Sequence, residues 1–136
     1  MSKSYLAWPV KLKDLSQELH VTLKYLGDSP FTLGDLGRRL AGIDTKLDLT
    51  RALWVPERFD HGAHVMVLDG LSSAPHAAHA AVKDLRKDDY PTWRPHMTLP
   101  ALPWARLTAA KATAKDTIES VGPLTLYVDK KAVVTF

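Results

Sequence analysis

Two four-residue stretches, His20-Val21-Thr22-Leu23 and His96-Met97-Thr98-Leu99, decide the fold of this chain. Each lies in a short apolar run next to turn-forming residues, a pattern that predicts a β-strand. Alternate side chains of a strand project to one face, so each histidine shares a face with the threonine two positions later, and the residue between them is buried. Two such strands can together build one site.

The repeated residue types suit phosphodiester chemistry without a metal. That reaction needs a base near the attacking oxygen and an acid near the leaving oxygen, and histidine can fill either role because its ordinary pKa is about 6.5. Threonine hydroxyls can donate hydrogen bonds to phosphate oxygens. We therefore predict His20, Thr22, His96 and Thr98 as catalytic residues, with no metal and no other cofactor. Which histidine is the base stays open, and either motif alone is better explained as an ordinary half-exposed strand.

Length and composition bound the kind of protein. The chain has 136 residues, enough to bury a core without disulfides, and we expect one domain over residues 1–136. It contains no cysteine, which excludes disulfides and thiolate metal sites and fits a cytoplasmic location. No apolar run is long enough for a membrane span or a signal peptide. The formal net charge of +3 suits a small anionic substrate or a nucleic-acid end, although solvated lysines and arginines also account for it.

Hydrophobic periodicity and turn residues divide the chain into alternating elements. Each motif strand is followed by a turn and a helix, which predicts two related halves with the histidine strands side by side or facing across a cleft. A polar connector is expected at 11–18 and a loop at 56–62. The expected strands, besides the second motif, are at 5–10, 20–26, 47–55, 63–68, 124–128 and 132–136, and the expected helices are at 32–43, 73–87 and 105–121.

Two longer stretches carry a family resemblance: His20-Val21-Thr22-Leu23-Lys24-Tyr25-Leu26-Gly27 and Trp93-Arg94-Pro95-His96-Met97-Thr98-Leu99. In this order they resemble the two signatures of the 2H phosphoesterase superfamily, whose paired histidines and hydroxyl residues match those of both motifs. The resemblance implies an α+β, bilobal, pseudo-two-fold fold, in which two antiparallel sheets line a central cleft and helices pack outside. It also implies an enzyme that acts on nucleotide phosphodiesters.

The resemblance leaves several substrates open. The chain is shorter than the RNA-end enzymes of the superfamily and has only residues 11–19 where they place a long helix, which argues against a polymer substrate. Compact members include viral proteins that degrade cyclic oligonucleotide immune signals, so we expect a cyclic oligonucleotide as substrate. The alternatives are a 2′,3′-cyclic phosphodiesterase or RNA-end enzyme, and a binding module without turnover. We expect no membrane association and no obligatory protein partner.

Five further residues are candidates for substrate binding. Tyr5, Trp8 and Trp54 offer rings on which a base could stack, and the strands of the two tryptophans could line the cleft; core positions are the alternative. Lys24 is expected on the strand face of the first motif. Arg94 lies two positions before His96 and is expected on the face of the second motif. Either cation could meet phosphate or sit at the rim of the cleft.

Two histidine pairs have a spacing that occurs in metal sites. They are His61 with His64 and His76 with His79. Neither pair has a neighbouring carboxylate or thiolate that completes a known pattern, so we interpret them as solvated histidines.

Overall fold

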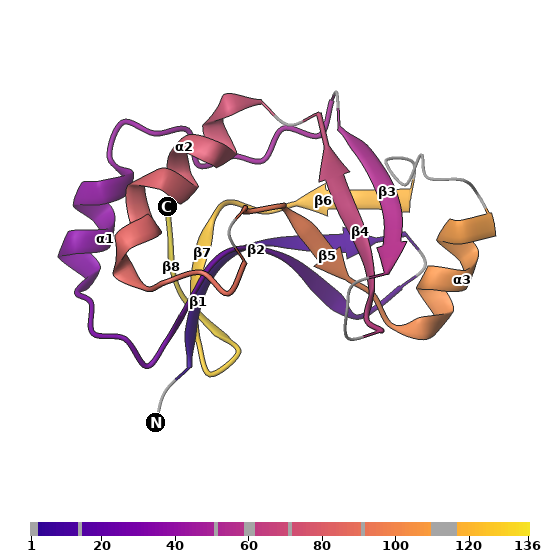
Figure 1. Cartoon of the computed structure of the whole chain (residues 1–136), viewed down its shortest axis with the longest axis horizontal. Coiled ribbons are helices and arrows are strands. Elements are labelled where there is room, and N and C mark those ends of the chain that lie inside the picture. The colour runs from indigo at the N-terminus through magenta and orange to yellow at the C-terminus, as the bar shows by residue number, and fades with distance from the viewer. Residues whose placement is uncertain are drawn as a thin grey trace.

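The computed structural model describes residues 3–13, 15–50, 52–58, 62–70, 72–90, 92–109 and 117–136. It is an α+β structure dominated by antiparallel strands, as expected (Figure 1). The elements in chain order are β1 (Ser4–Leu12), β2 (Glu18–Gly27), α1 (Leu33–Leu40), β3 (Leu53–Arg58), β4 (His64–Asp69), α2 (Ser73–Val82), the short 3-10 helix η1 (Lys83–Leu85), β5 (His96–Thr98), α3 (Ala101–Ala109), β6 (Ile118–Val121), β7 (Thr125–Val128) and β8 (Lys131–Thr135).

The strands form one sheet in the order β3-β4-β5-β2-β1-β7-β8, with β6 also paired to β1. The family resemblance implies two separate sheets, and the structure differs from that expectation. The reason is β5, the second motif strand, which pairs with β2 on one side and β4 on the other. It therefore joins the two halves of the chain through backbone hydrogen bonds.

The residues between each histidine and threonine fix this junction. Val21 of β2 is the partner of Met97 of β5 across the ladder, and Met97 is in turn opposite Met66 of β4. On its other side, Val21 is opposite Trp8 of β1. All four side chains are fully or almost fully buried, so a continuous apolar row runs across the sheet. The side chains of this row point into the core, so the motif histidines and threonines lie on the opposite face of the sheet.

Helices α1 and α2 pack together over one part of the sheet, and α3 lies at the end formed by β3 and β4 (Figure 1). Helix α1 begins after Thr32, whose hydroxyl accepts a hydrogen bond of 3.0 Å from the backbone N–H of Asp35. Its Leu36 and Leu40 are buried in the core, as their spacing predicts. Among the described residues, no helix is long and apolar enough to cross a membrane.

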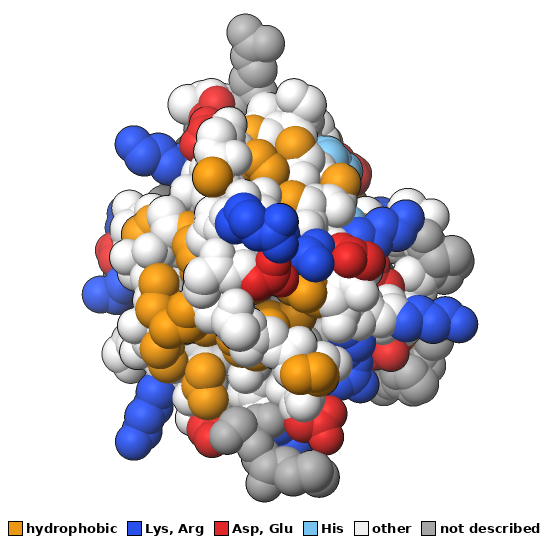
Figure 2. All heavy atoms as spheres, turned by 90° about the vertical axis from the view of Figure 1, so that its left-hand side faces the viewer, with side chains coloured by type: hydrophobic (Ala, Val, Ile, Leu, Met, Phe, Trp, Pro, Cys, Tyr) orange, Lys and Arg blue, Asp and Glu red, His pale blue; other side chains and the backbone are white. Residues whose placement is uncertain are grey.

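Charged side chains join α1 to η1. Arg39 of α1 bonds to Asp35 in its own helix at 2.8 Å and to Asp84 of η1 at 2.6 Å. Figure 2 shows this side of the molecule, where basic side chains lie beside carboxylates at the centre, with hydrophobic side chains above them and toward the lower left. These contacts help to place η1, from which the chain runs on to the second motif.

Several of the strand and helix bounds predicted from the sequence are wrong. Residues 118–121, expected at the end of the third helix, form β6, because β1 extends to Leu12 and β6 pairs with this additional length. The third helix is α3 (Ala101–Ala109), which begins four residues before the expected start at residue 105. Strand β3 begins at Leu53 and includes Pro56, which was expected in a loop; proline is tolerated there because β3 is an edge strand.

The closing hairpin is confirmed. Strands β7 and β8 pair antiparallel, and the two residues between them, Asp129 and Lys130, have φ angles of 49° and 68°. Positive φ at both central positions is the mark of a type I′ turn, whose twist matches that of the strands. The expected second helix is shorter than predicted, since α2 ends at Val82 and η1 follows.

The junction row predicts a large loss of stability when it is cut. Met97→Ala removes a fully buried side chain that packs between β2 and β4, and we expect it to lower the free energy of unfolding by about 2–5 kcal/mol. Val133→Ala is the control, because Val133 is 51% exposed and its truncation should cost about 0.5 kcal/mol or less. Urea unfolding followed by circular dichroism measures both. Equal losses for the two variants would contradict this account of the core.

Candidate active site

The pairing of Val21 with Met97 brings the two motifs onto one face. In an antiparallel ladder, the residues one step before and after a pair are opposite one another in reverse order, so His20 lies across from Thr98 and Thr22 across from His96. All four side chains project away from the core. Directly opposite Cβ atoms in such a ladder are about 4.5–5.5 Å apart, and diagonal neighbours about 7–8 Å. In this register the two imidazoles are therefore diagonal neighbours.

His96 is oriented by its own backbone. Its Nδ1 lies 2.8 Å from the carbonyl oxygen of Arg94. A carbonyl can only accept, so Nδ1 carries a hydrogen and donates it, and in the neutral ring Nε2 is then the nitrogen without one. The imidazole is thus held in the tautomer that exchanges protons through Nε2.

His20 lies in a more enclosed position between two tyrosines. Its ring meets the edges or faces of Tyr5 and Tyr127 in T-shaped contacts, with centroid distances of 5.8 and 4.7 Å. The Nε2 atom is buried and lies 3.4 Å from a carboxylate oxygen of Glu18, within ion-pair range. The same oxygen accepts a hydrogen bond of 3.3 Å from the Tyr127 hydroxyl. Glu18 is therefore shared by an imidazole and a phenol.

These surroundings set the protonation of the cluster. Burial lowers the pKa of His20 below its ordinary value, and the negative charge of Glu18 offsets part of that effect. Burial and the same carboxylate raise the pKa of Tyr127 to about 12. At neutral pH, the His20 imidazole is consequently neutral and the Tyr127 hydroxyl keeps its proton.

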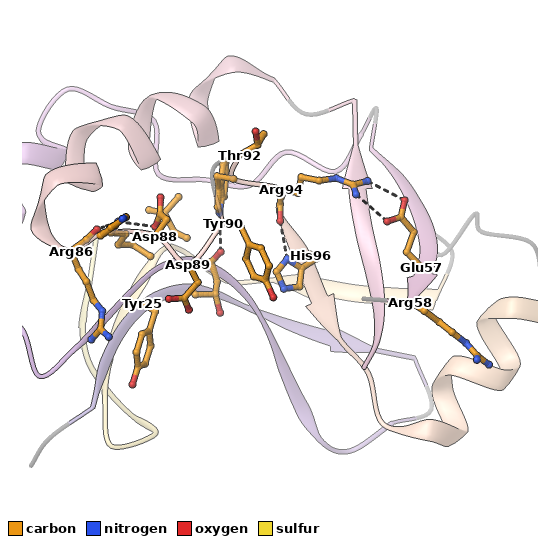
Figure 3. Close-up of a pocket in the computed structure, with 15 residues that line it drawn as sticks. Tyr25, Glu57, Arg58, Arg86, Asp88, Asp89, Tyr90, Thr92, Arg94 and His96 are labelled. Atoms are coloured by element: carbon orange, nitrogen blue, oxygen red, sulfur yellow. Dashed lines mark hydrogen bonds and ion pairs between the residues drawn. The ribbon is translucent and has the colours of Figure 1, made fainter. Parts of the chain in front are cut away.

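A cavity of about 630 Å³ opens beside the junction. It takes in Thr22 and His96, whereas His20 and Thr98 are not among its lining residues. Figure 3 shows Tyr90, Asp89 and Arg94 around it, with Tyr25 and Arg86 at one end. The complete lining is Thr22, Leu23, Lys24, Tyr25, Glu57, Arg58, Arg86, Lys87, Asp88, Asp89, Tyr90, Thr92, Trp93, Arg94 and His96.

A β-bulge changes the face on which Lys24 lies. Strand β1 pairs Ala7 with Thr22 but Leu6 with Lys24, so Leu23 is an additional residue on β2. Thr22 keeps the face of Ala7, while Lys24 takes the core-side face of Leu6, and its side chain is buried. The prediction that Lys24 shares the face of the first motif is therefore wrong.

Burial also decides the place of the two tryptophans. Trp8 and Trp54 are fully buried and pack within the hydrophobic core. The indole nitrogen of Trp8 donates a hydrogen bond of 2.8 Å to the carbonyl of Thr45. Of the two alternatives given for these residues, the core position is confirmed and the cleft position is wrong, because neither ring is exposed.

The other two candidate binding residues lie at the site. Tyr5 stacks on Tyr127, with ring centroids 5.1 Å apart, next to the first motif. Arg94 lines the cavity and forms two hydrogen bonds of 3.0 Å to the carboxylate of Glu57. Their part in substrate binding stays a prediction.

The two histidine pairs do not form a metal site among the described residues. His61 lies outside the residues that the structure describes. His64 stacks on Trp104 at 4.6 Å, and His79 stacks on Trp93 at 4.8 Å. His79 is also buried, so its interpretation as a solvated histidine is wrong.

Sequence reasoning missed residues that reach the site through pairing. Glu18 has a recognisable signal, since it precedes His20 by two positions and therefore shares its strand face. Tyr127 has none within its own segment, because it comes near His20 only through the register of β7 with β1. Tyr90 lies in an irregular segment, whose path no periodicity predicts.

Comparison with protein-family models, with curated proteins and with solved structures found no match. A functional assignment therefore depends on the register of β2 with β5, the surroundings of His20 and the cavity next to His96.

The position of Glu18 makes a direct prediction for His20. Glu18→Gln removes the charge that favours the imidazolium, so the pKa of His20 should fall further below its ordinary value. Titration of the His20 ring protons by NMR measures this change. Glu119→Gln is the control, because Glu119 is exposed on β6. An unchanged or higher His20 pKa in Glu18→Gln would contradict the assigned interaction.

Proposed function

We propose that this protein is a metal-independent phosphodiesterase that acts on a nucleotide phosphodiester. The observation that carries the proposal is the register of β2 and β5, which places two imidazoles and two hydroxyls on one face of the sheet. The cavity beside Thr22 and His96 supports it by offering space for a small ligand at this face. The two motifs are the parts of the chain that resemble 2H phosphoesterases.

In this proposal the two histidines have different roles. His20, whose pKa is lowered by burial, is neutral and accepts the proton of the attacking hydroxyl or water as the new P–O bond forms. His96, in its protonated form, donates to the leaving oxygen as the old P–O bond breaks. Thr22 and Thr98 donate to the non-bridging oxygens, on which negative charge increases.

Within this reaction class, the proposed substrate is a cyclic oligonucleotide. The short connection between β1 and β2, which provides little surface for a long RNA, supports a small substrate over a polymer. The experiment is incubation in EDTA with cyclic dinucleotides, 2′,3′-cyclic nucleotides and 2′-5′ oligoadenylate, followed by chromatography. Cleavage of one class is the expected outcome. Tight binding without any cleavage would show a binding module, and a strict requirement for a divalent metal would overturn the mechanism.

Substitution of the four motif residues tests their roles. His20→Ala and His96→Ala should each lower kcat by about 10²–10⁴-fold, because each removes a proton-transfer group. Thr22→Val and Thr98→Val should each lower kcat by about 10–10³-fold through loss of one hydrogen bond in the transition state. His64→Ala and Thr135→Val remove the same groups outside the site and serve as matched controls. Full activity of both motif histidine variants would place the catalytic centre elsewhere.

The assigned roles also predict the pH dependence. Because His20 must be neutral and His96 protonated, a plot of kcat/KM against pH should be bell-shaped. Activity should fall as the pH decreases through the pKa of His20, and that limb should lie below the ordinary histidine value of about 6.5. Glu18→Gln should move this limb to still lower pH. Movement to higher pH would exclude His20 as the base.

A further inference from the structure

The cavity beside His96 has two exposed aromatic rings that folding does not explain. Tyr25 is 42% exposed and Tyr90 is 52% exposed, although each carries a large apolar ring. Both line the cavity, and in Figure 3 Tyr90 lies between Asp89 and His96 while Tyr25 lies near Arg86 at the far end. Exposed aromatic side chains gathered in one cavity point to a ligand with a flat face of its own.

The ring of Tyr25 is part of a prepared surface. The guanidinium of Arg86 lies 5.0 Å from the centroid of this ring, which is cation–π distance. Gly27 makes this approach possible: a Cβ at Gly27 would lie 1.9 Å from a guanidinium nitrogen of Arg86. The strand thus ends on a residue without a side chain at the place where the arginine crosses it.

Residues 86–90 and 92–93 form one wall of the cavity and include Tyr90. Buried polar contacts hold this wall in place. The ammonium of Lys24, which is fully buried, donates to the carbonyls of Lys83 and Arg86 and lies 2.7 Å from a carboxylate oxygen of Asp88. The other oxygen of Asp88 lies 2.9 Å from Nε2 of His79. A buried ammonium is tolerated only with such full pairing, and the pairing fixes residues 83–88 against β2.

The same wall is tied to the first motif. Trp93 stacks on the ring of His79, with the ring planes 5° apart, and its indole nitrogen donates a hydrogen bond of 3.4 Å to the carbonyl of Thr22. The segment that leads into the second motif is thereby attached to the strand of the first. A wall held at both ends in this way is organised before a ligand arrives.

The charge of the cavity suits an anionic ligand. Lys24 and Arg94 are each paired with a carboxylate, that of Asp88 and that of Glu57. Of the other charged lining residues, Arg58, Arg86 and Lys87 are basic and Asp89 is acidic. A flat aromatic group and a negative charge together describe a nucleotide.

We infer that this cavity is the nucleoside subsite: the base attached to the scissile phosphate stacks on Tyr90, Tyr25 lines the far end of the same subsite, and the phosphate lies at Thr22 and His96. The inference rests on the proposed function for the position of the phosphate. It assigns the substrate a direction, from the β2–β5 junction toward Arg86. Residues 86–90 and 92–94 then decide which nucleotides bind, and Lys24 positions residues 86–88.

Isothermal titration calorimetry tests the subsite with the four nucleoside 3′-monophosphates and with inorganic phosphate. At least one nucleotide should bind wild-type protein, and Tyr90→Ala should weaken that binding by about 5- to 150-fold, the effect of losing a stacked base. Tyr25→Ala should weaken it in the same direction, whereas Tyr90→Phe, which keeps the ring, should bind within about twofold of wild type. Val133→Ala is the control for an exposed apolar side chain outside the cavity. Circular dichroism checks that each variant is folded.

The outcomes separate this inference from the proposed function. Nucleotide binding that is the same in wild type, Tyr90→Ala and Tyr25→Ala overturns the subsite, and it leaves the phosphodiesterase proposal intact if turnover still depends on His96. Nucleotide binding that depends on Tyr90, without turnover of any substrate, supports the subsite and overturns the enzyme. Failure of all four nucleotides to bind wild-type protein overturns the subsite directly.

Discussion

The antiparallel pairing of Val21 with Met97 holds the two motif strands together, and the candidate site depends on it. Both side chains are fully buried, so any shift of register by one residue would bury a histidine and expose an apolar side chain. The hydrophobic effect on one face therefore specifies the positions of His20, Thr22, His96 and Thr98 on the other. The short ladder between β2 and β5 therefore contributes to the stability of the core and also positions the candidate site.

A bulge at Leu23 changes the face of the sheet to which the polar side chains of strand β2 point. Before Leu23 its polar side chains face the proposed chemistry; after it, Lys24 turns to the core side and anchors the segment that leads to the second motif. The two histidines consequently sit in different environments. His20 is enclosed by Tyr5, Tyr127 and Glu18, whereas His96 opens to the cavity with its ring held by the carbonyl of Arg94.

The features that depend on neighbouring residues alone could be predicted from the sequence. The parity of the two motifs, the apolar positions of α1 and the final hairpin follow from strand alternation, helical spacing and turn chemistry, and the structure agrees with them. Lys24 and β6 were mispredicted because a bulge and the pairing of β6 with β1 depend on distant segments. Trp8 and Trp54 were open between core and cleft, since an aromatic residue on a strand suits either, and burial settled them as core. Tyr127 and Tyr90 reach the site only through the tertiary arrangement.

The central claim is that His20 and His96 act on one phosphate in one step, and the double variant His20→Ala/His96→Ala tests it most directly. Groups that act as a unit lose their joint contribution when either is removed. The kcat of the double variant should therefore be about the same as that of the less active single variant. Hydrolysis of the best substrate in EDTA, measured for wild type, both single variants and the double variant, gives the comparison. Losses that multiply in the double variant would contradict the claim, because they would show two histidines that act independently.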